Sequence, residues 1–287
     1  MKGTSTLAVL TVLVAFAPAC KKDKPVILAE SATALAAVAP PPSANVVTYD
    51  IDPASKTSID MPGVSEHIKA DTTAGAGKLD VDLMHVANTR GEVKIDLTTL
   101  ATHTFDDKDK NESQTGHAHN WLQVGDAATA EEKAANRYTV FAIQSLDNLS
   151  APDVTKVAPT KQDNEDIRTI TATVHGEFLL HGHKATKDVP IEARFHYPAG
   201  AKADSHPTRI DIKSTAPLKV TLKDFDVHPR DNFGKLTAWT TRLVSKVAET
   251  ADVSLDLHAS LSQSAPSMAP PSPSAAPSQS APSTSAH

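Results

Sequence analysis

Strict alternation of apolar and polar residues is the feature that most constrains the fold of this chain. In the segment VHGEFLLHGHK, residues 174–184, Val174, Gly176 and Phe178 share one face, and His175 and Glu177 lie on the other. Because successive side chains of a β-strand point to opposite faces, this period of two predicts a strand with one buried face. The Gly and the histidines at its end predict a hairpin turn at 181–183.

The same alternation recurs along much of the chain. It is found in IRTITA (167–172), DVPIEARFHY (188–197), RIDIKS (209–214), PLKVTL (217–222), DVSLDLHASL (252–261), LDVDL (79–83) and EVKIDL (92–97). Strands with one apolar face, joined by short turns, are typical of antiparallel sheets. The pattern therefore predicts an all-β fold, and it leaves open whether the strands form a sandwich or a closed barrel.

Two segments have a helical period instead. In LTAWTTRLVSKVAE (236–249), Leu236, Trp239, Leu243 and Val247 are spaced by three or four residues, which predicts one apolar face of a helix. A shorter helix is expected at 131–136, and the segment 117–122 is a second candidate for a short helix. One or two helices should thus decorate the β-core. Trp121 and Trp239 are interpreted as core anchors, with contact to a ligand as the alternative.

The N-terminus has the features of an export signal. Lys2 precedes an apolar run at 7–16 that is too short to span a bilayer, and small residues lead into Cys20. The sequence APAC resembles a bacterial lipoprotein signal, in which the cysteine is lipidated and becomes the new N-terminus; an ordinary secretory signal is the alternative. Cys20 is the only cysteine, and an exported protein gains little from one unpaired thiol. We predict a signal peptide at 1–19 and lipidation of Cys20.

Composition divides the remaining chain into three parts. Residues 31–46 are small, uncharged and Pro-bearing, which predicts a flexible tether over 20–45. Residues 262–287 are Ser, Pro and Ala without charged side chains, which predicts a disordered tail. Between them, 46–261 form the predicted domain. The net charge of −6 becomes −7 when Lys2 is removed with the signal peptide, so no nucleic-acid partner is expected.

The segment VHGEFLLHGHKATKDVPIEARF (174–195) resembles a signature of the YceI-like family, a strand ending in His-Gly followed by a Lys-containing turn and a second strand. YDIDPASKTSI (49–59), RGEVKIDLTTLAT (90–102), NESQTGHAHNWL (111–122) and DVHPRDNFG (226–234) resemble further family segments in the family order. The segment IDMPGVSEHIKADTTAGAG (59–77) departs from the family, because it is polar and Gly-rich where relatives are apolar and aromatic.

The resemblance implies an extended, lipocalin-like antiparallel β-barrel that binds an isoprenoid or another lipid-like amphiphile, such as a quinone. The inward-facing residues are then the expected ligand contacts, and small ones among them (Ala172, Gly176, Ala193 and Ala259) are expected to leave room for the ligand. The predicted ligand-binding residues are Ile170, Val174, Gly176, Phe178, Ile191, Ala193, Phe195, Val253, Leu255 and Leu257.

Motifs for catalysis or for metal binding are weak. The pairs His117/His119 and His181/His183 are interpreted as surface histidines, because a catalytic zinc needs three convergent ligands. The aspartates of FDDKDKNE (105–112) are interpreted as a solvated loop and not a calcium site, since the run lacks a Gly and contains lysines. No nucleophile or phosphate-binding motif is present. We predict a protein without catalytic activity, metal or cofactor.

Two functions remain open at this point. The first is a lipoprotein of the bacterial cell envelope, anchored to the outer membrane and facing the periplasm, that binds or carries an apolar ligand. The absence of Asp after Cys20, where Lys21 stands, favours the outer membrane. The second is a structural or assembly-related envelope lipoprotein whose barrel is filled by its own side chains.

Overall fold

The computed structural model of the chain describes residues 30–31, 34–36, 39, 45–63, 67–202, 205–229 and 249–262. The predicted signal peptide, Cys20, most of the tether, nearly all of the helix predicted at 236–249 and the tail from 263 lie outside these residues. Among the described residues, no helix is long and apolar enough to cross a membrane.

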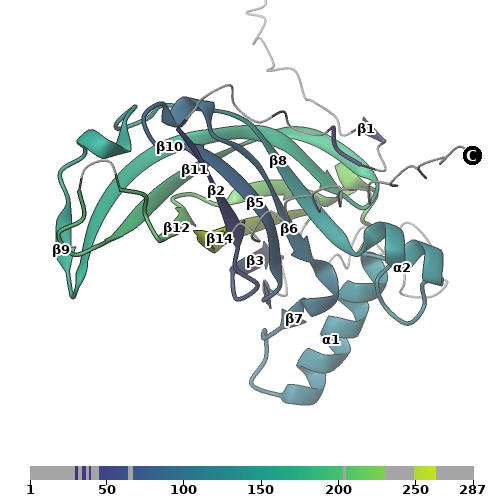
Figure 1. Cartoon of the computed structure of the whole chain (residues 1–287). Coiled ribbons are helices and arrows are strands. Elements are labelled where there is room, and N and C mark those ends of the chain that lie inside the picture. The colour runs from purple at the N-terminus through teal and green to yellow at the C-terminus, as the bar shows by residue number, and fades with distance from the viewer. Residues whose placement is uncertain are drawn as a thin grey trace, which may run out of the picture.

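Eight antiparallel strands of the described chain close into a ring (Figure 1). In ring order they are β2 (Val46–Ile51), β5 (Gly75–Asp82), β6 (Arg90–Asp96), β8 (Tyr138–Asp147), β10 (Glu165–Leu180), β11 (His183–Pro198), β12 (Arg209–Ser214) and β14 (Thr250–Leu261), which pairs again with β2. The ring confirms the all-β, antiparallel barrel that the alternation and the family resemblance predict.

The hairpin of β10 and β11 is the longest element, with 16 residues in each strand. Its two-residue turn has positive φ angles, 49° at His181 and 72° at Gly182. Turns with two such residues match the right-handed twist of the strands that they join. The predicted hairpin turn is therefore confirmed. The side chain of His181 is buried, however, so its interpretation as a surface histidine is wrong.

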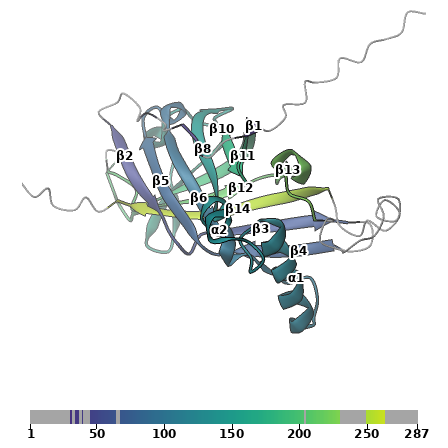
Figure 2. The same cartoon turned by 90° about the vertical axis from the view of Figure 1, so that its right-hand side faces the viewer.

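At one end of the barrel, β14 extends beyond the ring and pairs with other strands. Its first half contacts β13 (Leu218–Thr221) and β3 (Lys56–Pro62), and the sheet continues through β4 (His67–Thr72) to β7 (Ala101–Thr102). Figure 2 shows β3 and β4 beside α1 at this end. The short strands β1 (Glu30–Ser31) and β9 (Thr160–Gln162) pair with β11 and β10.

Two α-helices lie between β7 and β8 in the sequence: α1 (Lys108–Trp121) and α2 (Ala130–Asn136). The helix predicted at 131–136 is confirmed, and Thr129 and Glu132 form a capping box at its start. Helix α1 begins at Lys108, inside the stretch predicted as a solvated loop: Asp106, Asp107 and Asp109 are exposed as predicted, but the residues from 108 on are helical and not a loop. Asp107 starts the helix there by accepting hydrogen bonds from the backbone N–H groups of Asp109 and Lys110. Single-turn 3₁₀ helices occupy Val86–Asn88, Leu97–Thr99, Val154–Lys156 and Leu222–Phe225.

The ring itself is filled by side chains. Tyr49, Tyr197 and Ile170 are at most 2% exposed, and the Tyr49 hydroxyl donates to the Pro207 carbonyl at 3.0 Å. Near the start of β10, the buried guanidinium of Arg168 lies 5.0 Å from the centre of the Tyr197 ring and donates to the Val154 carbonyl. An eight-stranded barrel is just wide enough for such filling. Space for a ligand must therefore be sought at the other end of β10.

Candidate functional site

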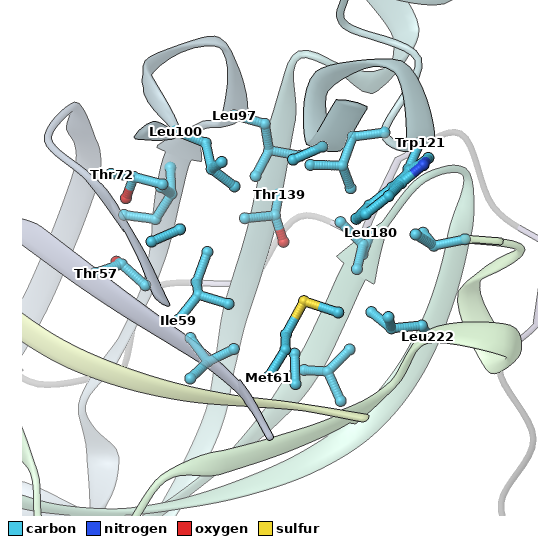
Figure 3. A pocket seen from close by; sticks show the side chains of 18 of the residues that line it. Thr57, Ile59, Met61, Thr72, Leu97, Leu100, Trp121, Thr139, Leu180 and Leu222 are labelled. Carbon is cyan, nitrogen blue, oxygen red and sulfur yellow. The ribbon is translucent and has the colours of Figure 1, made fainter. Parts of the chain in front are cut away.

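An apolar cavity of about 130 Å³ lies at the end of the barrel where β3, β4 and α1 adjoin the ring (Figure 3). Strands β3, β4 and β14 form one wall, and α1 with the residues that follow it forms another. The start of β8, the end of β10, strand β13, the Leu222–Phe225 turn and the segment 95–102 line the rest of it. Among the described residues that line the cavity, none is charged, and the polar ones are four threonines and Gln114.

The wall of β3 and β4 follows from a period of two in the sequence. Its inward side chains are paired across the two strands as Thr57 with Thr72, Ile59 with Ala70 and Met61 with Ile68. The residues between them face outward and are ionic or polar; the Lys56 ammonium, for example, lies 2.9 Å from the Asp71 carboxylate. This alternation gives the hairpin one face for the cavity and one for solvent.

Helix α1 closes the cavity with few apolar residues of its own. Its sequence KDKNESQTGHAHNW is polar around the whole circumference, and Gln114 is its only buried residue. The helix is held by polar contacts: the Thr104 hydroxyl donates to Gln114 Oε1 at 2.6 Å, and His119 Nε2 lies 2.9 Å from the Leu100 carbonyl oxygen. Ala118 and Trp121 reach the cavity. Figure 3 shows Trp121 on the side opposite Thr57 and Thr72.

A group of aromatic and basic residues borders the cavity near the β10–β11 turn. Phe178, which lines the cavity, meets Phe225 edge to face with 5.3 Å between ring centres. His181 Nδ1 lies 3.1 Å from the Phe225 carbonyl oxygen, and burial lowers the pKa of this imidazole below its usual value. Burial likewise lowers the pKa of Lys187, whose ammonium lies over the Phe225 ring. Uncharged His181 suits the apolar surroundings.

The structure divides the ten predicted ligand-binding residues into two groups. Phe178, Val253 and Leu255 line the cavity. The other seven do not line it and are packed inside the filled ring: Ile170, Val174, Gly176, Ile191, Ala193, Phe195 and Leu257.

The space expected above Gly176 is occupied. A Cβ atom at this position would lie 2.5 Å from Cε1 of Phe141 and 2.4 Å from the Ala142 carbonyl oxygen. The ring of Phe141, from the neighbouring strand β8, thus covers the glycine. Ala172, Ala193 and Ala259 are also fully buried by their neighbours. The room expected at Gly176 is therefore taken up by a side chain of the adjacent strand, and the three alanines do not line the cavity.

Most cavity residues were missed by the sequence analysis. Six of them lie in β3 and β4, whose sequence was interpreted only as the end of a segment that resembles the family (49–59) and as a polar departure from it (59–77). Others lie in α1 and in the segments 95–102 and 218–227. The sequence of β3 and β4 does alternate, with threonine in place of an aliphatic residue at inward positions 57 and 72, and this alternation could have predicted the cavity wall. Trp121 was expected to be a core anchor or, alternatively, a ligand contact, and it lines the cavity.

Several histidines of the described chain pair with carboxylates, such as His175, His196 and His258. His175 lies between Asp188 and Asp147, with nitrogen–oxygen distances of 2.7 and 2.8 Å. Hydrogen bonds to Asp188 and Asp147 raise the pKa of His175 above its usual value. Within the described ranges, no group of three or more His, Cys, Asp or Glu side chains is placed to hold a metal ion.

The fold and this cavity can be compared with known proteins. The YceI-like domain matches residues 49–259 of the sequence. The chain belongs to the YceI-like family. The match includes β2 to β14 and hence every strand of the ring and of the cavity wall.

Several solved structures are similar to this YceI-like chain. A polyisoprenoid-binding domain from Saccharophagus degradans, implicated in plant cell wall breakdown, has 14% identity and a TM-score of 0.46, over 75% of this chain and 99% of that one. BcnA from Burkholderia cenocepacia has 17% identity and a TM-score of 0.43, over 73% and 99%. The YceI protein of Campylobacter jejuni has 15% identity and a TM-score of 0.35, over 68% and 85%. No curated protein matches the sequence.

Proposed function

We propose that this YceI-like protein is a bacterial envelope lipoprotein that binds an apolar ligand, such as an isoprenoid or lipid-like chain, and carries no catalytic activity. The observation that carries the proposal is the cavity lined by apolar side chains such as Ile59, Met61 and Trp121 and by no charged residue. Apolar surface transferred from water into such a cavity contributes about 25 cal/mol per Å². A hydrocarbon chain can therefore bind there with few polar contacts.

The size of the cavity limits how much of the ligand it holds. An engineered cavity of about 150 Å³ is known to accommodate benzene, and the cavity here has about 130 Å³. One or two branched units of a chain fill this space, and a longer ligand must extend past the wall. Helix α1 is the part of the wall with the least apolar packing, so we place the exit of the chain beside Ala118 and Trp121.

The proposed anchor is the acyl chain on Cys20, as the N-terminal sequence predicts. Strand β1 supports a role for the anchor in placing the cavity, since Glu30 pairs with Lys184 and Ser31 with His183. In the same hairpin, His183 pairs with Leu180, which lines the cavity. Nine residues lie between Cys20 and Glu30, and the ten steps from one Cα atom to the other extend at most about 35 Å. A lipidated chain would thus keep the cavity end of the barrel near the membrane that supplies the ligand.

Native mass spectrometry of the chain from Lys21 to His287, incubated with a bacterial membrane lipid extract, tests the binding proposal. This chain contains every residue that the structure describes. We expect one bound apolar molecule per chain. Ala70→Leu, which adds three carbons inside the cavity, should remove the adduct. Ala101→Leu should keep it, because Ala101 is the exposed residue of β7 and does not line the cavity. Unliganded wild-type protein alone would refute the proposal.

The alternative function, a structural lipoprotein with a filled barrel, has one observation in its favour. The ring interior between Arg168 and Gly176 is packed, and Phe141 occupies the space over the glycine. Failure of the wild-type chain to take up any apolar molecule would favour this alternative.

A further inference from the structure

Two threonine hydroxyls in the cavity wall lack hydrogen-bond partners. Thr57 on β3 and Thr72 on β4 are directly opposite one another in the strand register. Both residues line the cavity, and their exposed fractions are 4% and 1%. Neither Oγ1 atom has a hydrogen-bond partner. Figure 3 shows the two side chains next to each other on the side of the cavity opposite Trp121.

The other threonines of the cavity wall differ from this pair. The Thr139 hydroxyl donates to the Leu179 carbonyl at 2.8 Å, and the Thr102 hydroxyl donates to the Asn111 carbonyl at 2.8 Å. A threonine whose hydroxyl is bound to the backbone presents only its methyl group to a ligand. Buried polar groups without partners are rare in folded proteins, and each one calls for an explanation. Within the described chain, Thr57 and Thr72 are the two lining threonines whose hydroxyls have no partner; both Oγ1 atoms are buried, so a ligand in the cavity reaches them only after the side chains rotate.

The surroundings of the pair define the ligand group that fits it. The described lining contains no Lys, Arg or His that could neutralise an anion and no carboxylate that could neutralise a cation. A charged group buried here would remain unpaired, which is strongly unfavourable. Each threonine hydroxyl can donate one hydrogen bond, and a carbonyl oxygen can accept two through its two lone pairs. A neutral carbonyl therefore matches both donors at once.

We propose that Thr57 and Thr72 form a polar subsite that binds a neutral carbonyl oxygen on the buried end of an otherwise apolar ligand. This inference rests on the proposed function and narrows its ligand class to ketones, quinones, amides and esters. Binding requires only rotation about the Cα–Cβ bond of each threonine, by which the hydroxyl takes the position that the methyl group held in the starting rotamer. A charged headgroup, by contrast, stays outside the cavity.

Calorimetric binding to the chain from Lys21 to His287 tests the inference with two probes. One is a methyl ketone of about six carbons, because a cavity of similar size holds benzene, and the other is the hydrocarbon in which CH₂ replaces the carbonyl. We expect the ketone to bind about tenfold more tightly than the hydrocarbon. The double variant Thr57→Val/Thr72→Val, which is close to isosteric, should lose this preference and bind the two probes alike. Its thermal stability without ligand should be unchanged or higher, because the unpaired hydroxyls are gone.

Thr139→Val is the matched control. It removes a hydroxyl from the same cavity, but one that the Leu179 carbonyl already engages, so the preference for the ketone should persist. Equal binding of both probes by the wild-type chain, or a preference that survives in the double variant, would overturn the subsite while leaving the proposed function intact. Failure of both probes to bind would overturn the proposed function and the subsite with it.

Discussion

Gly176→Ala should destabilise the barrel, because the position has no room for even a methyl group. The added Cβ would lie 2.4 Å from the Ala142 carbonyl oxygen and 2.5 and 2.7 Å from two ring atoms of Phe141. Phe141 can turn away only by leaving its packing, and the carbonyl belongs to the backbone of β8. Overpacking of this kind costs about 1–3 kcal/mol. For a domain of this size, a loss of about 2 kcal/mol lowers Tm by roughly 4–8 °C.

Urea denaturation followed by circular dichroism, on the chain from Lys21 to His287, measures this effect. Gly116→Ala is the control, because Gly116 lies in α1 with nothing within 4 Å of its Cβ position. Alanine is favoured over glycine in a helix by about 1 kcal/mol, so this variant should be as stable as the wild-type protein or more stable. If Gly176→Ala were as stable as wild type, the ring interior would have free space at β10, contrary to the structure.

Three further predictions concern His175, His181 and the anchor. Asp188 and Asp147 raise the pKa of His175, so its contribution to the free energy of unfolding should be present below about pH 6.5 and be lost as pH rises through the folded-state pKa. His175→Gln should remove this decrease of stability with rising pH. Burial lowers the pKa of His181, so the protein should lose stability as pH falls below about 6.5. His181→Asn should remove this decrease of stability with falling pH, and asparagine tolerates the positive φ angle at this position. Denaturation curves measured from pH 5 to 9 would show both slopes, and variants with unchanged slopes would contradict the two assignments. Cys20→Ser should move the protein from the membrane fraction to the soluble envelope fraction or block its processing, since an acyl chain contributes ~0.8 kcal/mol per buried CH₂. Immunoblots of the fractions check this. Unchanged membrane attachment would contradict the lipidation of Cys20.

The sequence predicts those strands whose two faces differ clearly. The segments that form β10, β11 and β14 alternate over ten or more residues, so their inward faces could be assigned without a structure. Strand β8 did not stand out in the same way. Its pairing with β10 contains a register shift at His175 and Gly176, and such irregularities interrupt the period of two.

The position of the cavity could not be predicted from the inward faces alone. Whether a small residue such as Gly176 leaves a void depends on the side chain that reaches over it from the next strand, here Phe141. The hairpin of β3 and β4 was overlooked for a related reason. Thr57 and Thr72 count as polar in a hydropathy pattern, yet both are buried. Threonine fits buried strands well because of its branched Cβ, so its polarity conceals the inward face.

Photo-crosslinking with an apolar chain that carries a diazirine at its buried end is the most direct test of the central claim, that the ligand lies in the cavity and not in the ring. After irradiation of the chain from Lys21 to His287, peptide mass spectrometry locates the labelled residues. The structure predicts labels on cavity residues such as Ile59, Met61 and Trp121. Labels on Val174, Ile191 or Phe195, which lie in the filled ring and do not line the cavity, would contradict the claim.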